Sequence, residues 1–143
     1  IEDWADNAIK QFGIAKGAAK QYAGTLNAMF KASNITSDNS SVMAVKMVEL
    51  AGDLSAFYNI DTADAYQKIQ SGLAGMVRPL RSLGIDLSVA TLQEYALSKG
   101  ITKSWTEMTQ AEKVMLRYQY LLDHTQTQQG DFARTSGKLK TAA

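Results

Sequence analysis

Apolar residues recur every three or four positions along almost the whole chain of 143 residues, and this period constrains the fold more than any other feature. The longest stripe consists of Met43, Met47, Leu50, Ala51, Leu54, Phe57 and Tyr58. Such spacing places apolar side chains on one face of a helix, from which they can pack into a core. Strict apolar–polar alternation never persists beyond a few residues. The sequence therefore predicts an all-α fold.

The same period predicts further helices, which together make a compact bundle of about six. Besides the stripe above, the expected helices cover residues 1–12, 19–30, 62–73, 88–100 and 109–122. Glycines follow three of them, and glycine commonly ends a helix because it adopts positive φ without strain. Thr109 and Glu112 have the spacing of a capping box at the start of the last helix. We expect that helix to bury one face, consisting of Ala111, Val114, Met115, Tyr118, Leu121 and Leu122.

A Pro/Gly corner near residues 75–88 separates the fourth and fifth long helices. Pro79 is the only proline and suits the first turn of a short helix over 79–83, which Gly84 would end. We expect Arg78 and Arg81 to bind carboxylates or helix C-terminal carbonyls around this corner. The alternative, a phosphate site, normally has a glycine-rich strand–loop–helix context, and the sequence lacks it.

Length and composition limit the possible functions. A chain of this length and 45% apolar residues forms one domain with a real core. A net charge of +1 gives no general attraction to nucleic acid or an anionic membrane. The absence of cysteine excludes disulfides and thiolate metal sites. Because the sequence begins "IEDW" without an initiator Met, we expect a piece of a longer protein.

Residues with catalytic chemistry are few, and we predict no catalytic, cofactor-binding or metal-binding residue. The only histidine, His124, adjoins Asp123 on a helix, where adjacent side chains point about 100° apart, so we expect an ordinary surface histidine. Glu49 and Asp53 stand one turn apart and could form an acid pair. A solvated helix face is the favoured interpretation, since Lys46 lies three residues before Glu49.

Two other features have a binding alternative. The six methionines and the aromatic residues of the longest stripe could line an adaptable groove, but stripes at this spacing are more often core. The C-terminal stretch carries Arg134, Lys138 and Lys140 without an acid after Asp131. We expect a solvated basic tail or linker over 137–143, since three charges are few for nucleic-acid contact.

Three strings in order carry a family resemblance: "RPLRSLGIDLSVATLQEYALSKGI" (78–101), "MTQAEKVMLRYQYLL" (108–122) and "QGDFARTS" (129–136). Together they resemble the tail tape measure proteins of siphophages and related prophages. The segments "QFGIAKGAAKQYAGTLNAMF" (11–30) and "VELAGDLSAFYNI" (48–60) look like the same region. The chain departs from the family's usual pattern at "LAGMVRPLR" (73–81).

The resemblance implies a structural role in the phage tail: tail assembly, tail-length determination and genome ejection. It implies a single helical module over 1–136 within a longer tape measure protein. The implied partners are other copies of that protein, tail tube and tail-tip proteins, tail assembly chaperones and, on ejection, the host membrane. No specific nucleic acid and no small-molecule substrate is expected. The implied location is the tail tube lumen of the virion, and the host cytoplasm during assembly.

Two alternatives within such a tail protein stay open. The module could cleave peptidoglycan, for which Glu49, Glu94 or Glu112 would have to supply the carboxylates, because Cys/His and zinc chemistries need residues that are absent here. It could also interact with the membrane through the apolar segment 43–58.

Overall fold

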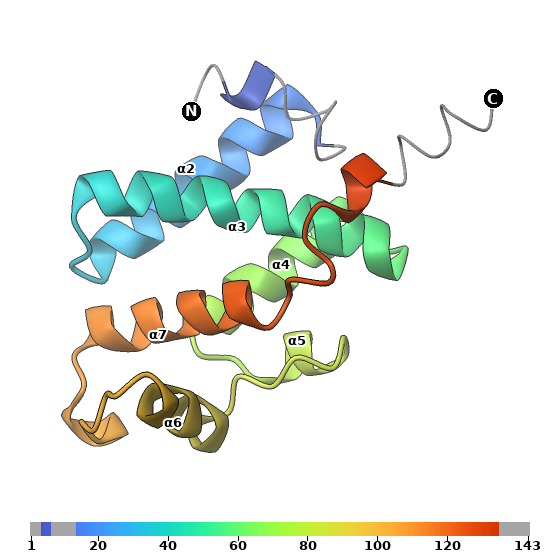
Figure 1. The fold of residues 1–143 in the computed structure, drawn as a ribbon. Helices are drawn as coiled ribbons and strands as arrows, with labels where there is room; N and C mark the ends of the chain where they lie inside the picture. The colour runs from blue at the N-terminus through green and yellow to red at the C-terminus, as the bar shows by residue number, and fades with distance from the viewer. Residues whose placement is uncertain (1–3, 7–13, 135–143) are drawn as a thin grey trace.

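The computed structural model describes residues 4–6 and 14–134, which form helices joined by short turns (Figure 1). The elements are α2 (Lys16–Ala32), α3 (Ser37–Tyr58), α4 (Thr62–Leu73), α5 (Arg78–Arg81), α6 (Val89–Ser98), the 3₁₀ helix η1 (Trp105–Glu107) and α7 (Gln110–Asp123). Residues 4–6 and 131–134 are also helical. These described ranges hold no strand, so the prediction of an all-α bundle is confirmed. Most of the helix expected over 1–12, and the tail 137–143, lie outside them.

Local signals set the helix boundaries. The side chain of Thr36 accepts the Asn39 N–H at the start of α3, and Ser88 accepts the Thr91 N–H at the start of α6. The capping box of α7 is complete, because Thr109 accepts the Glu112 N–H and Glu112 accepts the Thr109 N–H. Each cap satisfies backbone donors that a helix start leaves unpaired.

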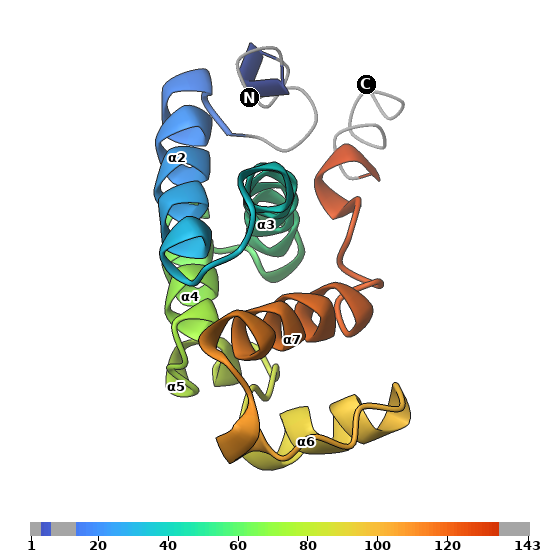
Figure 2. The same cartoon turned by 90° about the vertical axis from the view of Figure 1, so that its left-hand side faces the viewer.

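The core forms around α3, with α2 and α4 along one side of it (Figure 2). Met43, Met47, Leu50 and Leu54 are buried, which confirms the stripe as core. Phe57 was expected inside and is 42% exposed. It lies in the last turn of α3, just before the chain turns away at Asn59 (φ 56°), and its ring packs edge-on against neighbouring Tyr58.

Helix α7 lies between two layers, with α3 on one side and α6 on the other (Figures 1 and 2). It therefore buries more than the single predicted face. The predicted Val114, Tyr118 and Leu121 are buried, but so are Leu116, Arg117 and Tyr120. Ala111, Met115 and Leu122 are only partly buried, because the buried face of α7 is turned from the predicted stripe toward Leu116, Arg117 and Tyr120.

The Pro/Gly corner is present as predicted. Pro79 stands in the first turn of α5, and Gly84 has a φ of +80° just after it. The N–H of Ile85 donates to the Leu80 carbonyl at 3.1 Å, which closes the turn, and Leu80 is fully buried. Asp86 then accepts hydrogen bonds from the Ser88 N–H and the Thr91 hydroxyl, so the corner leads directly into the cap of α6.

Candidate functional site

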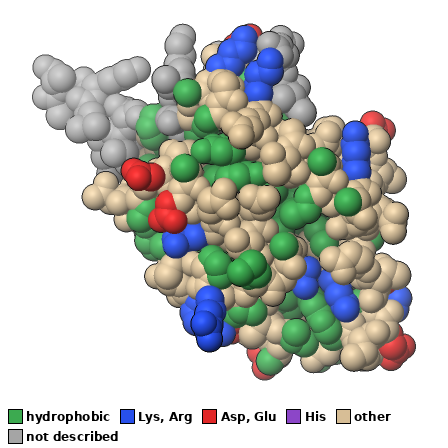
Figure 3. Space-filling view, turned by 180° about the vertical axis from the view of Figure 1, so that it is seen from behind, with side chains coloured by type: hydrophobic (Ala, Val, Ile, Leu, Met, Phe, Trp, Pro, Cys, Tyr) green, Lys and Arg blue, Asp and Glu red, His purple; other side chains and the backbone are tan. Residues whose placement is uncertain are grey.

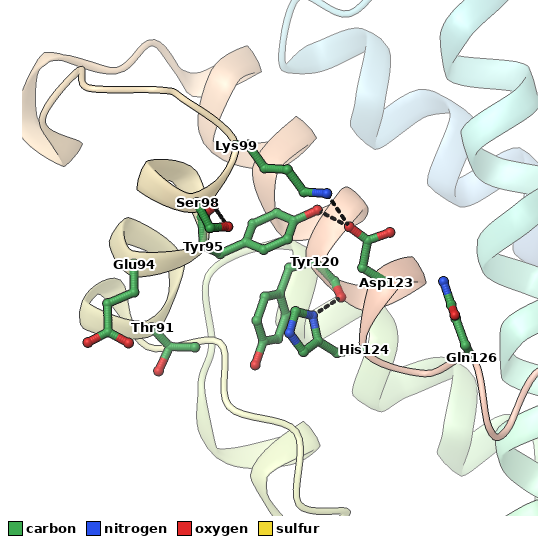
Figure 4. Close-up of a pocket in the computed structure, with 9 residues that line it drawn as sticks. All are labelled: Thr91, Glu94, Tyr95, Ser98, Lys99, Tyr120, Asp123, His124 and Gln126. Carbon is green, nitrogen blue, oxygen red and sulfur yellow. Dashed lines mark hydrogen bonds and ion pairs between the residues drawn. The ribbon is translucent and has the colours of Figure 1, made fainter.

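A shallow polar depression of about 580 Å³ lies between α6 and the C-terminal end of α7 (Figure 4). It is lined by Thr91, Glu94, Tyr95, Ser98, Lys99, Tyr120, Asp123, His124 and Gln126. The lining residues from α6 and its C-terminal cap are at positions 91, 94–95 and 98–99. This spacing of three or four residues places them on one side of the helix. Helix α7 ends at Asp123, and its last turn supplies Tyr120 and Asp123 to the depression.

Asp123 is the centre of this depression. Its Oδ2 accepts a hydrogen bond from the Tyr95 hydroxyl, and Lys99 Nζ stands 3.4 Å from the same oxygen. The Tyr95 hydrogen bond, with help from Lys99, lowers the pKa of Asp123. Burial, reinforced by the hydrogen bond to Asp123, raises the pKa of Tyr95. At neutral pH the pair is therefore an ionised carboxylate and a neutral phenol.

Aromatic rings form the floor of the depression. His124 stacks on Tyr120 with ring centroids 3.9 Å apart, and Tyr95 meets the Tyr120 ring edge-on at 5.4 Å. His124 is exposed, as predicted, and its Nδ1 lies 3.1 Å from the Tyr120 carbonyl oxygen. Because a carbonyl only accepts, Nδ1 carries the proton in that contact. The site thus offers hydrogen-bonding groups and ring faces, which suits recognition of a polar partner.

The predicted solvated face of Glu49 and Asp53 is wrong. Asp53 is only 4% exposed and accepts the N–H groups of Gly130 at 2.8 Å and Phe132 at 3.3 Å. Glu49 is half-buried and accepts the indole N–H of Trp4 at 2.9 Å. Residues near the two ends of the chain cover these acids, and burial raises the pKa of both carboxyl groups. They bind separate partners rather than each other.

The other carboxylates considered for hydrolysis have different surroundings. Glu112 belongs to the capping box and also binds Lys103 Nζ at 2.8 Å. The Lys103 hydrogen bond and the Thr109 N–H lower the pKa of Glu112 to about 2, so it stays ionised. Glu94 is exposed on the rim of the α6–α7 depression. Glu49 and Glu112 therefore have clear structural partners, whereas Glu94 faces solvent.

The corner arginines do not have the predicted partners. Among the described residues neither Arg78 nor Arg81 forms an ion pair. The hydrogen bond from the Thr91 hydroxyl chiefly lowers the pKa of Asp86, and the Arg81 charge makes a smaller contribution. Instead Arg117 of α7, only 8% exposed, donates from Nη1 to the Leu73 carbonyl at 3.2 Å. The C-terminal carbonyl of α4 is thus bound by an arginine from another helix, because the corner turns its own arginines outward.

Charges of both signs are spread over the face in Figure 3 and do not gather into one basic patch. Arg134 of the predicted basic stretch donates to the carbonyls of Thr127 and Gln129 at 3.0 Å and stands 3.7 Å from Asp131. Lys138 and Lys140 lie outside the described residues. This part of the stretch is thus engaged in local contacts.

In the described part of the chain, no three His, Asp or Glu side chains are grouped so that they could hold a metal ion. None of the helices described combines the length and the hydropathy needed to cross a membrane. No protein-family model, curated protein or solved structure matches this chain.

Proposed function

We propose that this chain is a structural segment of a phage tail tape measure protein, acting in tail assembly, tail-length determination and genome ejection. In this proposal it works through packing surfaces and performs no catalysis. The observation that supports it is where the sequence segments that resemble tape measure proteins lie in the fold. Two of the strings span whole or nearly whole helices, and residues of different strings contact one another.

The string 78–101 contains α5, the Gly84 turn and α6, and the string 108–122 contains the cap and nearly all of α7. Tyr95 of the first meets Tyr120 of the second edge-on. Phe30, in the segment 11–30, meets Tyr118 edge-on with centroids 6.5 Å apart.

The remaining strings meet on the other side of α3. Asp53 of the segment 48–60 accepts the N–H of Gly130 from the string 129–136. Some of the residues that carry the resemblance therefore make contacts between the helices. A resemblance that lies in packing contacts, rather than in a reactive group, supports a structural role.

The proposed partners are other copies of the tape measure protein, tail tube and tail-tip proteins and tail assembly chaperones, with the host membrane on ejection. The proposed location is the tail tube lumen, and the host cytoplasm during assembly. The α6–α7 depression, with its exposed His124 and Glu94, is the candidate contact site for one of these proteins.

The test is an in-frame deletion of residues 14–134 in the phage or prophage that encodes the chain, with tail lengths measured by electron microscopy. A single straight α-helix over residues 14–134 would span roughly 180 Å at about 1.5 Å per residue. Because the module is compact, we expect the deletion to shorten the tails by less than this length. Peptides of the chain should also be found in purified tails. The proposal would be refuted if the deletion left the tail length unchanged and the peptides were absent from tails of the undeleted phage.

A cell-wall-degrading module is the alternative that the exposed Glu94 favours. Purified protein would then clear a cell-wall suspension, and Glu94→Gln would abolish the clearing while Glu112→Gln would not. Leakage of liposomes at neutral and at low pH tests the membrane-interacting alternative. The structural proposal expects neither activity.

A further inference from the structure

The segment after α7 contacts the body of the molecule differently from the longer helices α2, α3, α4, α6 and α7, each of which buries several residues. Residues 126–134 leave the end of α7 and run beside α3 (Figures 1 and 2). Thr125, at the base of this segment, is fully buried, but no residue from 126 to 134 is. The segment is therefore held on α3 with little burial of apolar side chains.

Three hydrogen bonds join the segment to α3. Asp53 accepts the N–H groups of Gly130 and Phe132, and the Tyr58 hydroxyl accepts a hydrogen bond from Gln128 Nε2 at 2.9 Å. Asp53 supplies two of these three acceptors from one buried carboxylate. A carboxylate at the first turn of a short helix binds N–H groups that otherwise have no partner.

The segment also forms bonds that do not involve α3, some to the end of α7 and some within the segment. The Gln129 amide donates to the Leu122 carbonyl and the Thr125 hydroxyl, and Arg134 donates to the carbonyls of Thr127 and Gln129. These bonds do not involve α3, so they can persist when the segment leaves it. Polar attachment to the body and internal bonding together are the properties expected of a unit that opens locally.

We propose that residues 126–134 form a detachable strap, which Asp53 holds on α3 and which leaves it as one unit while the helical body stays folded. Asp53 acts as the latch because both of its carboxylate oxygens are engaged by the strap. When Asp53 releases it, the strap moves away from α3 but stays joined to the end of α7, because Gln129 still donates to Leu122 and Thr125. The strap thereby controls how far whatever follows residue 134 can move from the body.

Amide hydrogen exchange on the purified chain tests the latch. In Asp53→Asn the carboxamide has one oxygen and turns an NH₂ toward the second strap N–H, so we expect exchange at Gly130 and Phe132 to accelerate at least tenfold. Exchange in α2, α3, α4 and α7 should stay within about twofold of the parent chain. Asp64→Asn is the matched control, since Asp64 is exposed on α4 and its ion-pair partner is Lys68 of the same helix.

A second variant disrupts the strap without altering α3. Gly130 has a φ of +79° and donates its N–H to Asp53, and proline can do neither. Gly130→Pro should accelerate strap exchange as much as Asp53→Asn does, and the double variant should add nothing, because both break the same attachment. Equal acceleration in all helices, additive effects in the double variant, or unchanged exchange at Phe132 would each overturn the proposal.

Discussion

Gly72, inside α4, is a residue whose missing side chain matters. A Cβ at this position would stand 2.6 Å from Leu80 Cδ1 and 2.8 Å from Leu87 Cδ1, and both leucines are buried. We expect Gly72→Ala to lower the free energy of unfolding by up to about 2 kcal/mol, since overpacking costs about 1–3 kcal/mol and better helix propensity returns about 1 kcal/mol. Urea unfolding measures the change.

Gly24 provides the matched control, because it lies inside α2 with no heavy atom within 4 Å of a Cβ added there. Gly24→Ala should raise the free energy of unfolding by about 0.5–1 kcal/mol. If both substitutions stabilise the chain, the close packing of α4 on the Pro/Gly corner is wrong.

Glu49 predicts a pH dependence. Burial raises its pKa above the ordinary value of 4.5 in the folded chain. The folded state therefore binds the proton more tightly than the unfolded state, so this group favours folding below about pH 4.5 and loses that contribution as the pH rises through its folded pKa. Glutamine keeps an oxygen for the Trp4 indole and carries no charge. Glu49→Gln should therefore gain stability over the parent between pH 4.5 and 7, as measured by thermal unfolding. A loss of stability at pH 7 that is absent at pH 4 would contradict this assignment.

At the scale of the element, the end of α4 depends on a side chain from α7. Replacing Arg117 by Ala removes the donor to the Leu73 carbonyl and the packing of a nearly buried side chain. We expect a loss of about 2–3 kcal/mol in the free energy of unfolding. Arg78→Ala and Arg81→Ala, at exposed positions in the corner, should each change it by less than about 0.5 kcal/mol. If Arg78→Ala or Arg81→Ala lowered the free energy of unfolding more than Arg117→Ala does, the prediction that the corner's own arginines hold it would be right instead.

At the scale of the whole molecule, α7 joins the α2–α4 layer to α6. Leu121 is fully buried in α7, so Leu121→Ala should cost about 2–5 kcal/mol and accelerate hydrogen exchange in both layers. Leu97 on α6 is 61% exposed, and Leu97→Ala should change stability by less than about 0.5 kcal/mol. Exchange that accelerates only in α6 after the Leu121 change would show that the layers unfold independently.

The longer described helices, the capping box of α7 and the corner could be predicted from the sequence because each depends on neighbours a few residues away. The period of the Met43–Tyr58 stripe, the Thr109–Glu112 box and the Pro79–Gly84 turn are signals of this kind. The resemblance to tape measure proteins was inferred from the sequence alone, so the function that rests on it stays a proposal.

Only the tertiary structure decided which polar residues are buried and what they bind. Asp53 lies on the edge of the apolar stripe, three residues after Leu50, and that position was the available signal for its burial. Its partner Gly130 is 77 residues away, Arg117 is 44 residues from Leu73, and Asp123 is 28 from Tyr95. The physical reason is that helical periodicity fixes which side chains share a face, but not which distant segment covers it. Whether a charged side chain faces water or a backbone donor therefore depends on how the helices pack.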